Sequence, residues 1–125
     1  MTDSAKQYTD FYAQAGKLIG ERSCEVMNAQ RQAALQTFEA LQFPTRKVER
    51  YKYTDVAADF APNYGIALTP LQVKDLPFCH RISEAPIDVT PFFNQLADKQ
   101  DAVVALNTML GVDALVIYVP RNTKV

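Results

Sequence analysis

Five prolines in the middle third of the chain set the strongest limit on its fold. They fall between residues 60 and 91, at Pro62, Pro70, Pro77, Pro86 and Pro91. Proline has no backbone N–H to donate, and its ring clashes with the preceding helical turn, so helices of normal length are excluded there. We expect an irregular layer of loops, with short extended segments at 65–68 and 71–73.

The N-terminal segment has the periodicity of an amphipathic helix. Apolar residues recur at steps of three and four, which places them on one helical face. They are Tyr8, Phe11, Tyr12, Ala15, Leu18 and Ile19. Ser4, with Gln7 three residues later, fits a capping box at the start of this helix, and Gly20 is a typical stop.

A second helix is predicted over residues 29–42, with Asn28 as its N-cap. The residue before a proline avoids helical geometry, so the helix should end at Phe43 and Pro44. Its apolar face would hold Ala34, Leu35, Phe38 and Leu41. The polar residues lie mostly on other faces, and they are Gln30, Arg31, Gln36 and Glu39. Neither helix is stable with one apolar stripe alone, so each must bury it against the other or against a further element.

The C-terminal third contains two helix signals. Thr90 followed by Pro91 fits a cap with proline at the first helical position. Phe92, Phe93 and Leu96 would make that turn apolar. A further helix is predicted over 101–110 and would end at Gly111. Its buried side would hold Ala102, Leu106 and either Met109 or Leu110.

Residues 114–119 are six apolar residues rich in β-branched side chains, a pattern that predicts a buried strand. No other segment has a strand signal of similar strength, and a buried strand needs neighbours. We therefore expect the chain to continue beyond residue 125, or this strand to pair with another copy. The predicted class is α+β: an N-terminal helical pair, an irregular middle, one further helix and a terminal strand.

Charge and hydropathy exclude several classes of partner. The chain has 13 basic and 14 acidic residues and a net charge of −1, which gives no overall attraction to nucleic acid or anionic lipid. No apolar run approaches the roughly 18 residues of a membrane span. The polar N-terminus lacks the apolar core of a secretory signal. These features predict a cytoplasmic protein with no membrane and no nucleic-acid partner.

Residues for reactive chemistry are scarce. Cys24, Cys79 and His80 are the candidate ligands for iron or zinc. Neighbouring residues of an extended chain point in opposite directions, and metal sites ordinarily need about four ligands at wider spacing. Asp98 and Asp101 fit helix starts better than acid–base catalysis. We expect no enzymatic activity, no cofactor, no metal site and two reduced cysteines.

Residues 43–56 combine proline, basic and aromatic residues in the order Phe-Pro-Thr-Arg-Lys-Val-Glu-Arg-Tyr-Lys-Tyr-Thr-Asp-Val. In an extended strand, Tyr51 and Tyr53 would share a face. We favour a structural corner in which the tyrosines pack and the cations stay solvated. A protein-docking surface is the second interpretation, and nucleic-acid binding is disfavoured by the net charge. The candidate residues are Pro44, Thr45, Arg46, Lys47, Glu49, Tyr51, Lys52, Tyr53 and Thr54.

This segment resembles the entry motif of SufD proteins of iron–sulfur cluster assembly. A second segment, Ala-Leu-Asn-Thr at 105–108 followed by Leu-Val-Ile-Tyr-Val-Pro at 115–120, is similar to the approach to that family's central β-helix. The related SufB proteins fit less well. The region between Gly65 and Ala105 is shorter than the family pattern leads us to expect.

The resemblance implies a non-catalytic scaffold component of the SUF system, working in a complex with SufB-like and SufC-like proteins. It implies an N-terminal domain over 1–112 and the first strand of a β-helix over 113–125. The residues tied to cluster building lie in the family's β-helix and C-terminal segment, so none is transferred to this chain. The alternative is a small module that binds protein or nucleic acid through residues 46–53.

Overall fold

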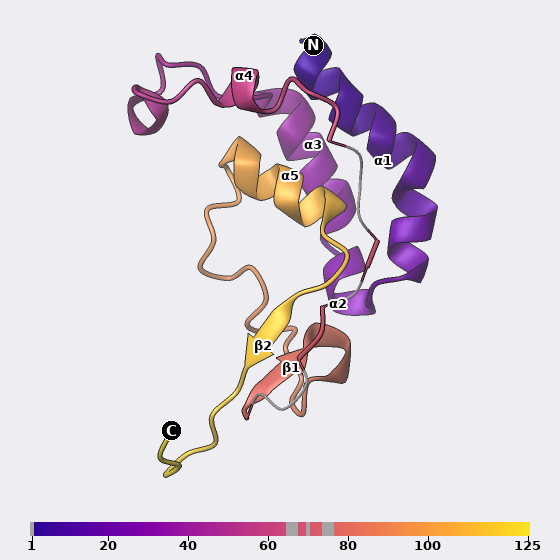
Figure 1. The fold of residues 1–125 in the computed structure, drawn as a ribbon, viewed down its shortest axis with the longest axis vertical. Helices are drawn as coiled ribbons and strands as arrows, with labels where there is room; N and C mark the ends of the chain where they lie inside the picture. The colour runs from indigo at the N-terminus through magenta and orange to yellow at the C-terminus, as the bar shows by residue number, and fades with distance from the viewer. Residues whose placement is uncertain (1, 65–67, 70, 74–76) are drawn as a thin grey trace.

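Helices occupy one end of the molecule and a small sheet lies at the other (Figure 1). The computed structural model describes residues 2–64, 68–69, 71–73 and 77–125. Their elements in chain order are α1 (Asp3–Glu21), α2 (Glu25–Asn28), α3 (Arg31–Leu41), η1 (Glu49–Tyr51), α4 (Val56–Asp59), β1 (Cys79–Arg81), η2 (Ile82–Glu84), α5 (Ala102–Leu110) and β2 (Leu115–Ile117). The predicted α+β class is confirmed.

The proline-rich middle follows the prediction of irregular structure where it is described. Residues 68, 69 and 71–73 form neither helix nor strand, so the extended segment predicted at 71–73 is not a strand of a sheet. Most of the segment predicted at 65–68 lies outside the described residues. In the part of the chain that the structure describes, no helix is both long and apolar enough to cross a membrane.

Helix α1 forms as predicted, but both of its ends differ from the expectation. Thr2, rather than Ser4, is the N-cap, and its hydroxyl oxygen accepts a hydrogen bond from the amide of Ala5 at 3.4 Å. Gly20 lies inside the helix, because the Arg22 amide still bonds to the carbonyls of the last turn. Glycine is common where a helix ends, but a glycine alone does not end a helix.

The predicted second helix forms as α3, which begins two residues later than predicted, and the short helix α2 precedes it in a stretch for which no helix was predicted. Asn28 does not cap α3. Its side-chain nitrogen Nδ2 instead donates to the carbonyl oxygen of Gly20 at 3.0 Å, and its side-chain oxygen Oδ1 accepts from the Arg31 Nε at 2.9 Å. Helix α3 ends at Leu41, one residue earlier than predicted, and Gln42 has φ 55°. The predicted end before Pro44 is therefore confirmed within a residue or two.

Arg31 contradicts the prediction that it lies away from the buried face. Its side chain is buried, with 3% of the residue exposed. The guanidinium donates to the carbonyl oxygens of Thr108 at 3.3 Å and Met109 at 3.2 Å, and to the Ser23 hydroxyl at 2.9 Å. A cation at the C-terminus of a helix satisfies its last carbonyls and its negative dipole end, so Arg31 fastens α3 to the end of α5.

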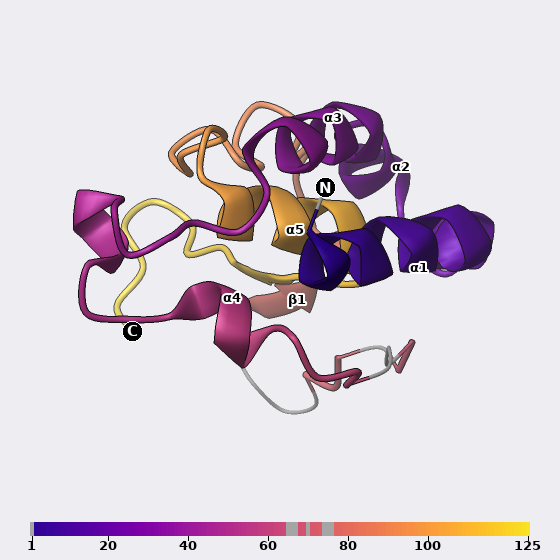
Figure 2. The ribbon, with the colours of Figure 1, turned by 90° about the horizontal axis from the view of Figure 1, so that it is seen from above.

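The main core lies where α5 packs against α3 and α1 (Figure 2). Phe38 of α3 is fully buried and meets Phe43 edge-to-face, with ring centroids 5.2 Å apart. Phe43 in turn stacks on Phe60 at 5.0 Å and meets Tyr8 at 5.6 Å. The Tyr8 hydroxyl donates to the carbonyl oxygen of Phe60 at 2.7 Å, so this buried aromatic keeps a polar partner.

Strands β1 and β2 pair antiparallel, with Cys79 opposite Ile117 and Arg81 opposite Leu115. The expectation that the C-terminal strand lacks a partner in this chain is therefore wrong. It is also wrong that this strand is buried, because 47% of Leu115 and 67% of Ile117 are exposed. The partner strand was missed because Cys-His-Arg carries no alternating apolar pattern.

The helix predicted at Thr90 and Pro91 does not form. The amides of Phe92 and Phe93 both bond to the Val89 carbonyl, and Asn94 then takes φ 57°, which leaves a turn. Helix α5 follows the prediction, with Asp101 as its N-cap and Gly111 after its last residue. Gly111 is needed for space, because an added Cβ would lie 2.8 Å from the carbonyl oxygen of Asn107.

Replacing Phe38 by Ala should lower the free energy of unfolding by about 3–5 kcal/mol, because it leaves a cavity in the aromatic core. Leu41, on the same helix and 45% exposed, is the matched control. Leu41→Ala should cost less than about 1 kcal/mol. Urea unfolding followed by circular dichroism measures both, and equal losses would contradict the position of the core.

Candidate functional site

The basic and aromatic segment after Phe43 folds as a tight corner. The amide of Val48 bonds to the Thr45 carbonyl at 3.1 Å, and the Thr45 hydroxyl accepts from the Lys47 amide at 3.3 Å. The single helical turn η1 then carries Arg50 and Tyr51. This segment is therefore not extended, and Tyr51 and Tyr53 do not share one packed face.

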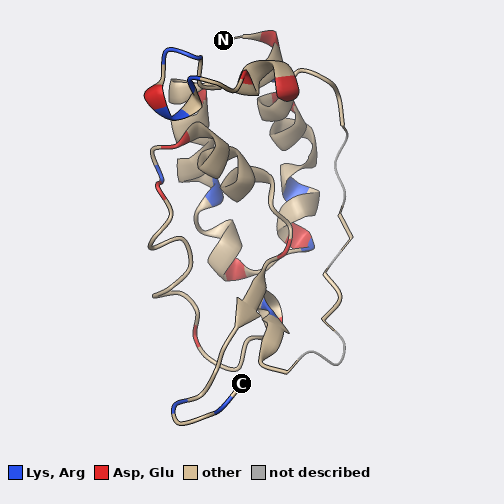
Figure 3. Ribbon diagram, turned by 60° about the vertical axis from the view of Figure 1, so that its left-hand side comes forward, with Lys and Arg blue, Asp and Glu red and all other residues tan. Residues whose placement is uncertain are grey.

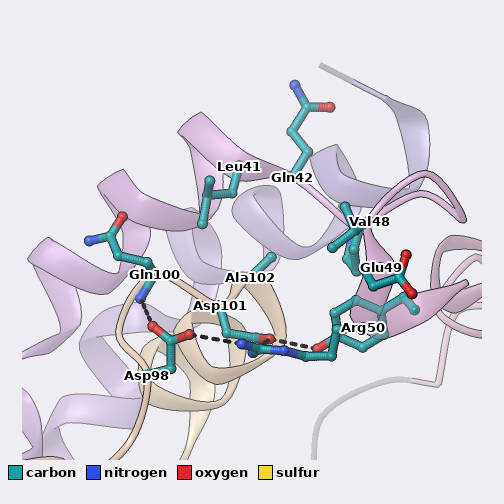
Figure 4. Close-up of a pocket in the computed structure, with 11 residues that line it drawn as sticks. Leu41, Gln42, Val48, Glu49, Arg50, Asp98, Gln100, Asp101 and Ala102 are labelled. Carbon is teal, nitrogen blue, oxygen red and sulfur yellow. Dashed lines mark hydrogen bonds and ion pairs between the residues drawn. The ribbon is translucent and has the colours of Figure 1, made fainter.

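Arg50 and Tyr51 meet two acids that precede α5, and Figure 4 shows Arg50 between them. The Arg50 Nη1 lies 2.8 Å from the Asp101 Oδ2, and its Nη2 lies 3.3 Å from the Asp98 Oδ2. The Tyr51 hydroxyl donates to the same Asp101 oxygen at 2.6 Å. We call these four residues the Arg50 corner; it joins segments about 50 residues apart in the chain.

Asp101 is the centre of the Arg50 corner. Its side chain is only 6% exposed, and its Oδ1 accepts from the amides of Val103 at 2.8 Å and Val104 at 3.2 Å. Burial is the largest single influence on the pKa of Asp101 and raises it, but the hydrogen bonds from Tyr51, from both amides and from Arg50 together lower it. The hydrogen bond to Asp101 in turn raises the pKa of Tyr51. The carboxylate is thus held ionised and fully hydrogen-bonded.

A hollow of about 470 Å³ lies beside the Arg50 corner. Figure 4 shows the Asp98–Arg50–Asp101 bridge on one side of it and the apolar side chains of Leu41 and Val48 on the other. Both apolar residues are partly solvent-exposed, at 45% and 44%. The hollow therefore has an apolar wall and a charged wall. The charged groups of that wall, Arg50, Asp98 and Asp101, are paired with one another.

The candidate residues from the sequence divide into two groups. Pro44, Glu49 and Tyr51 line the hollow. The others are exposed outside it, namely Thr45, Arg46, Lys47, Lys52, Tyr53 and Thr54. Figure 3 shows basic residues gathered on this protruding segment.

The structural-corner interpretation thus fits Tyr51 but not Tyr53. Tyr53 is 90% exposed and has the Lys52 Nζ 5.5 Å from its ring centroid. The expectation of solvated cations holds only in part at Arg50, whose side chain is 60% exposed but ion-paired. Sequence reasoning placed Asp98 and Asp101 at a helix start, but no local signal connects residue 50 with residue 101.

The cysteines and the histidine lie away from the Arg50 corner. Cys79 and His80 are neighbours in β1, where they face Ile117 and Val116. Cys24 packs against the cluster formed by Met27, Ile82 and Val89. Both thiols are free and half-buried. Among the residues that the structure describes, no three histidine, cysteine or acidic side chains are grouped to hold a metal ion.

The family comparison matches nearly the whole chain. The SufBD protein N-terminal region matches in two segments, residues 2–79 and 78–125. The chain belongs to this family. The SufBD N-terminal region points to the SUF system of iron–sulfur cluster assembly, and the match names SufB and SufD together. Searches of curated proteins and of solved structures gave no significant match.

Replacing Asp101 by Ala should destabilise the fold by about 2–4 kcal/mol at neutral pH, because α5 loses its cap and a tyrosine hydroxyl loses its acceptor. Asp98→Ala, which removes a half-exposed acid from the same guanidinium, should have a much smaller effect. Urea unfolding of both variants measures the difference.

The effect of Asp101→Ala should also depend on pH. The pKa of Asp101 is lowered in the folded protein, so its carboxylate stabilises the fold above the unfolded value of about 3.9. That stabilisation is lost as the pH falls through the folded value. The gap between the unfolding free energies of wild type and variant should therefore shrink as the pH falls below the unfolded pKa of about 3.9. An unchanged gap would mean that the charge of Asp101 is not what stabilises the corner.

Proposed function

We propose that this chain is the N-terminal region of a SufD-type scaffold component of the SUF system, which acts by contact and not by catalysis. The observation that carries the proposal is the family match over residues 2–79 and 78–125. The finer assignment to SufD is supported by the Pro-Thr-Arg-Lys motif at 44–47 and by the Leu-Val-Ile-Tyr-Val-Pro segment at 115–120.

The chemistry of the Arg50 corner supports a structural role. A general base needs a free lone pair and a pKa near the working pH. Asp101 instead accepts four hydrogen bonds, and its pKa is lowered. Such a group is a weak base that stiffens the junction between η1 and α5. The corner would then hold the exposed segment 45–54 in one shape.

Shape and surface are what a scaffold offers its partners. We propose that the protein works in the cytoplasm together with SufB-like and SufC-like proteins. Residues 52–54 protrude next to the stiff corner, and Tyr53 is almost fully exposed. An exposed aromatic on a rigid support suits protein contact, since tyrosine is a frequent interface anchor.

One observation favours the alternative of a module that binds a polyanion. In the described part of the chain, Arg46, Lys47 and Lys52 form no ion pair, and Lys52 lies beside an exposed aromatic ring. Basic residues next to aromatic ones suit single-stranded nucleic acid. The net charge of −1 weighs against it, so we keep the scaffold role as the conclusion.

Co-expression tests the scaffold role directly. The product of the natural gene is expressed with an affinity tag. It should co-purify with untagged SufB-like and SufC-like proteins and elute with them from a size-exclusion column. The tag on an unrelated protein is the control. If the tagged protein elutes alone although both partners are soluble, the proposed role is wrong.

Replacing Cys79 by Ala should leave iron–sulfur cluster assembly unchanged, because a contact scaffold needs no thiol at this position. Activity of a cluster-containing enzyme in cells that depend on the protein measures the effect. Cys79→Val is the matched variant, because it removes the thiol but keeps bulk in the half-buried strand β1. Loss of assembly in both variants, with folding retained, would contradict a purely non-catalytic role.

A further inference from the structure

A second hollow lies between α3 and α5, beside the coil that leads into α5 (Figure 2). Its volume is about 280 Å³, just below the range of about 300–1,000 Å³ for sites that take drug-sized ligands, so it suits a smaller molecule. The helices give it an apolar wall of short side chains, among them Ala33, Ala34 and Ala105. Its polar lining consists of Gln30, Thr37, Asn94, Lys99, Gln100 and Thr108.

Lys99 gives this lining a positive charge. Among the described residues that line the hollow it is the one charged side chain, and it forms no ion pair with them or with the rest of the described chain. The neighbouring carboxylate of Asp98 is already paired, because its Oδ1 accepts from the Gln100 amide at 3.0 Å and its Oδ2 lies 3.3 Å from the Arg50 Nη2. The hollow therefore favours a ligand with one negative charge.

The side-chain amide of Asn94 is fixed in one orientation. The Thr108 hydroxyl donates its only hydrogen to the Val104 carbonyl at 3.0 Å, so it must accept from the Asn94 Nδ2 at 2.9 Å. The second Nδ2 hydrogen goes to the Gln30 Oε1 at 3.2 Å, and Gln30 is itself held by donation to the Phe93 carbonyl. Both hydrogens of Nδ2 are thus used. The oxygen Oδ1 is left as an acceptor to which no described residue donates.

The remaining polar groups lie toward the other end of the hollow. Arg31 bonds to the last carbonyls of α5, so the later turns of α3 lie toward the start of α5. Thr37 follows Gln30 by about two turns, or roughly 10 Å along the helix. Lys99 and Gln100 immediately precede α5 and therefore lie at the Thr37 end. The side chains of these three residues bond to no part of the described chain.

We propose that the hollow between α3 and α5 binds a small aliphatic carboxylate that carries a hydroxyl group at the far end of its chain. The carboxylate accepts from the Lys99 ammonium and from its neutral neighbours Thr37 and Gln100. The aliphatic chain lies along the alanines, and the terminal hydroxyl donates to the Asn94 Oδ1. A single cation matches one carboxylate better than a doubly charged phosphate. This site goes beyond the proposed scaffold role and does not depend on it.

Ligand titration of the whole purified protein tests the proposal, with saturation-transfer nuclear magnetic resonance as the readout. The probe is 5-hydroxypentanoate, which should bind saturably below roughly 5 mM. Pentanoate lacks the hydroxyl, and 5-hydroxypentanamide replaces the carboxylate by a neutral amide. Each should bind at least about fivefold more weakly, because one end of the hollow then has no partner. Equal affinity for all three compounds, or no saturable binding, would overturn the proposal.

Two pairs of variants locate the site. Lys99→Ala should weaken binding of 5-hydroxypentanoate by about fivefold or more, whereas Lys17→Ala removes an exposed lysine of α1 and should leave the affinity unchanged. Ala33→Leu fills the hollow without altering a polar group and should also weaken binding. Ala40→Leu, on the exposed side of the same helix, is its control. Equal losses within either pair would place the ligand elsewhere and overturn the proposal.

Competition separates the proposed ligand class from another anion. Inorganic phosphate at the same concentration should not displace 5-hydroxypentanoate, and displacement would show a site for phosphate groups and overturn the assignment to a carboxylate. Circular dichroism checks that each variant folds, and if Ala33→Leu does not, the lysine pair and the three compounds still decide. These titrations need no SufB-like or SufC-like protein, so failure here is distinct from failure of the scaffold role.

Discussion

The buried guanidinium of Arg31 holds the helical half of the molecule together. It reaches the carbonyl end of α5 from the start of α3, and none of its hydrogen-bond partners among the described residues is acidic. With that end fixed, the rest of α5 is placed: Asp101 at its other end meets Arg50 and Tyr51, and Gly111 leads on to β2. Burial lowers the pKa of Arg31, yet the helix dipole and carbonyl oxygens favour the charged form. One helix thus organises both the Arg50 corner and the sheet.

The elements that the sequence predicts well are those specified by local chemistry. Helix α1 has a regular apolar stripe, and α5 has an acidic cap before it and a glycine after it. What the sequence does not reveal depends on partners far along the chain. Arg31 is polar and so looks solvent-exposed, but the carbonyls that bury it lie 77 and 78 residues away. Strand β1 exists because β2 pairs with it, not because Cys-His-Arg favours a strand.

The candidate site shows the same division. The composition of residues 43–56 was enough to find the segment and to support a family resemblance that the family match confirms at the level of SufB and SufD together. It was not enough to give its conformation, because the helical turn at Arg50 and Tyr51 is fixed by Asp98 and Asp101. The sequence gives Tyr51 and Tyr53 no different roles, yet Tyr51 bonds to Asp101 whereas Tyr53 is exposed to solvent.

The tight approach at Gly111 affects more than the end of its helix. The Cβ of any other residue there would lie 2.8 Å from the carbonyl oxygen of Asn107, and the backbone would have to shift to relieve the clash. Gly111 lies between α5 and β2. A small rotation of the backbone at this residue would therefore displace the far end of β2 by a larger distance. The position of β2, and of the sheet that it forms with β1, is thereby set by a glycine that has no side chain.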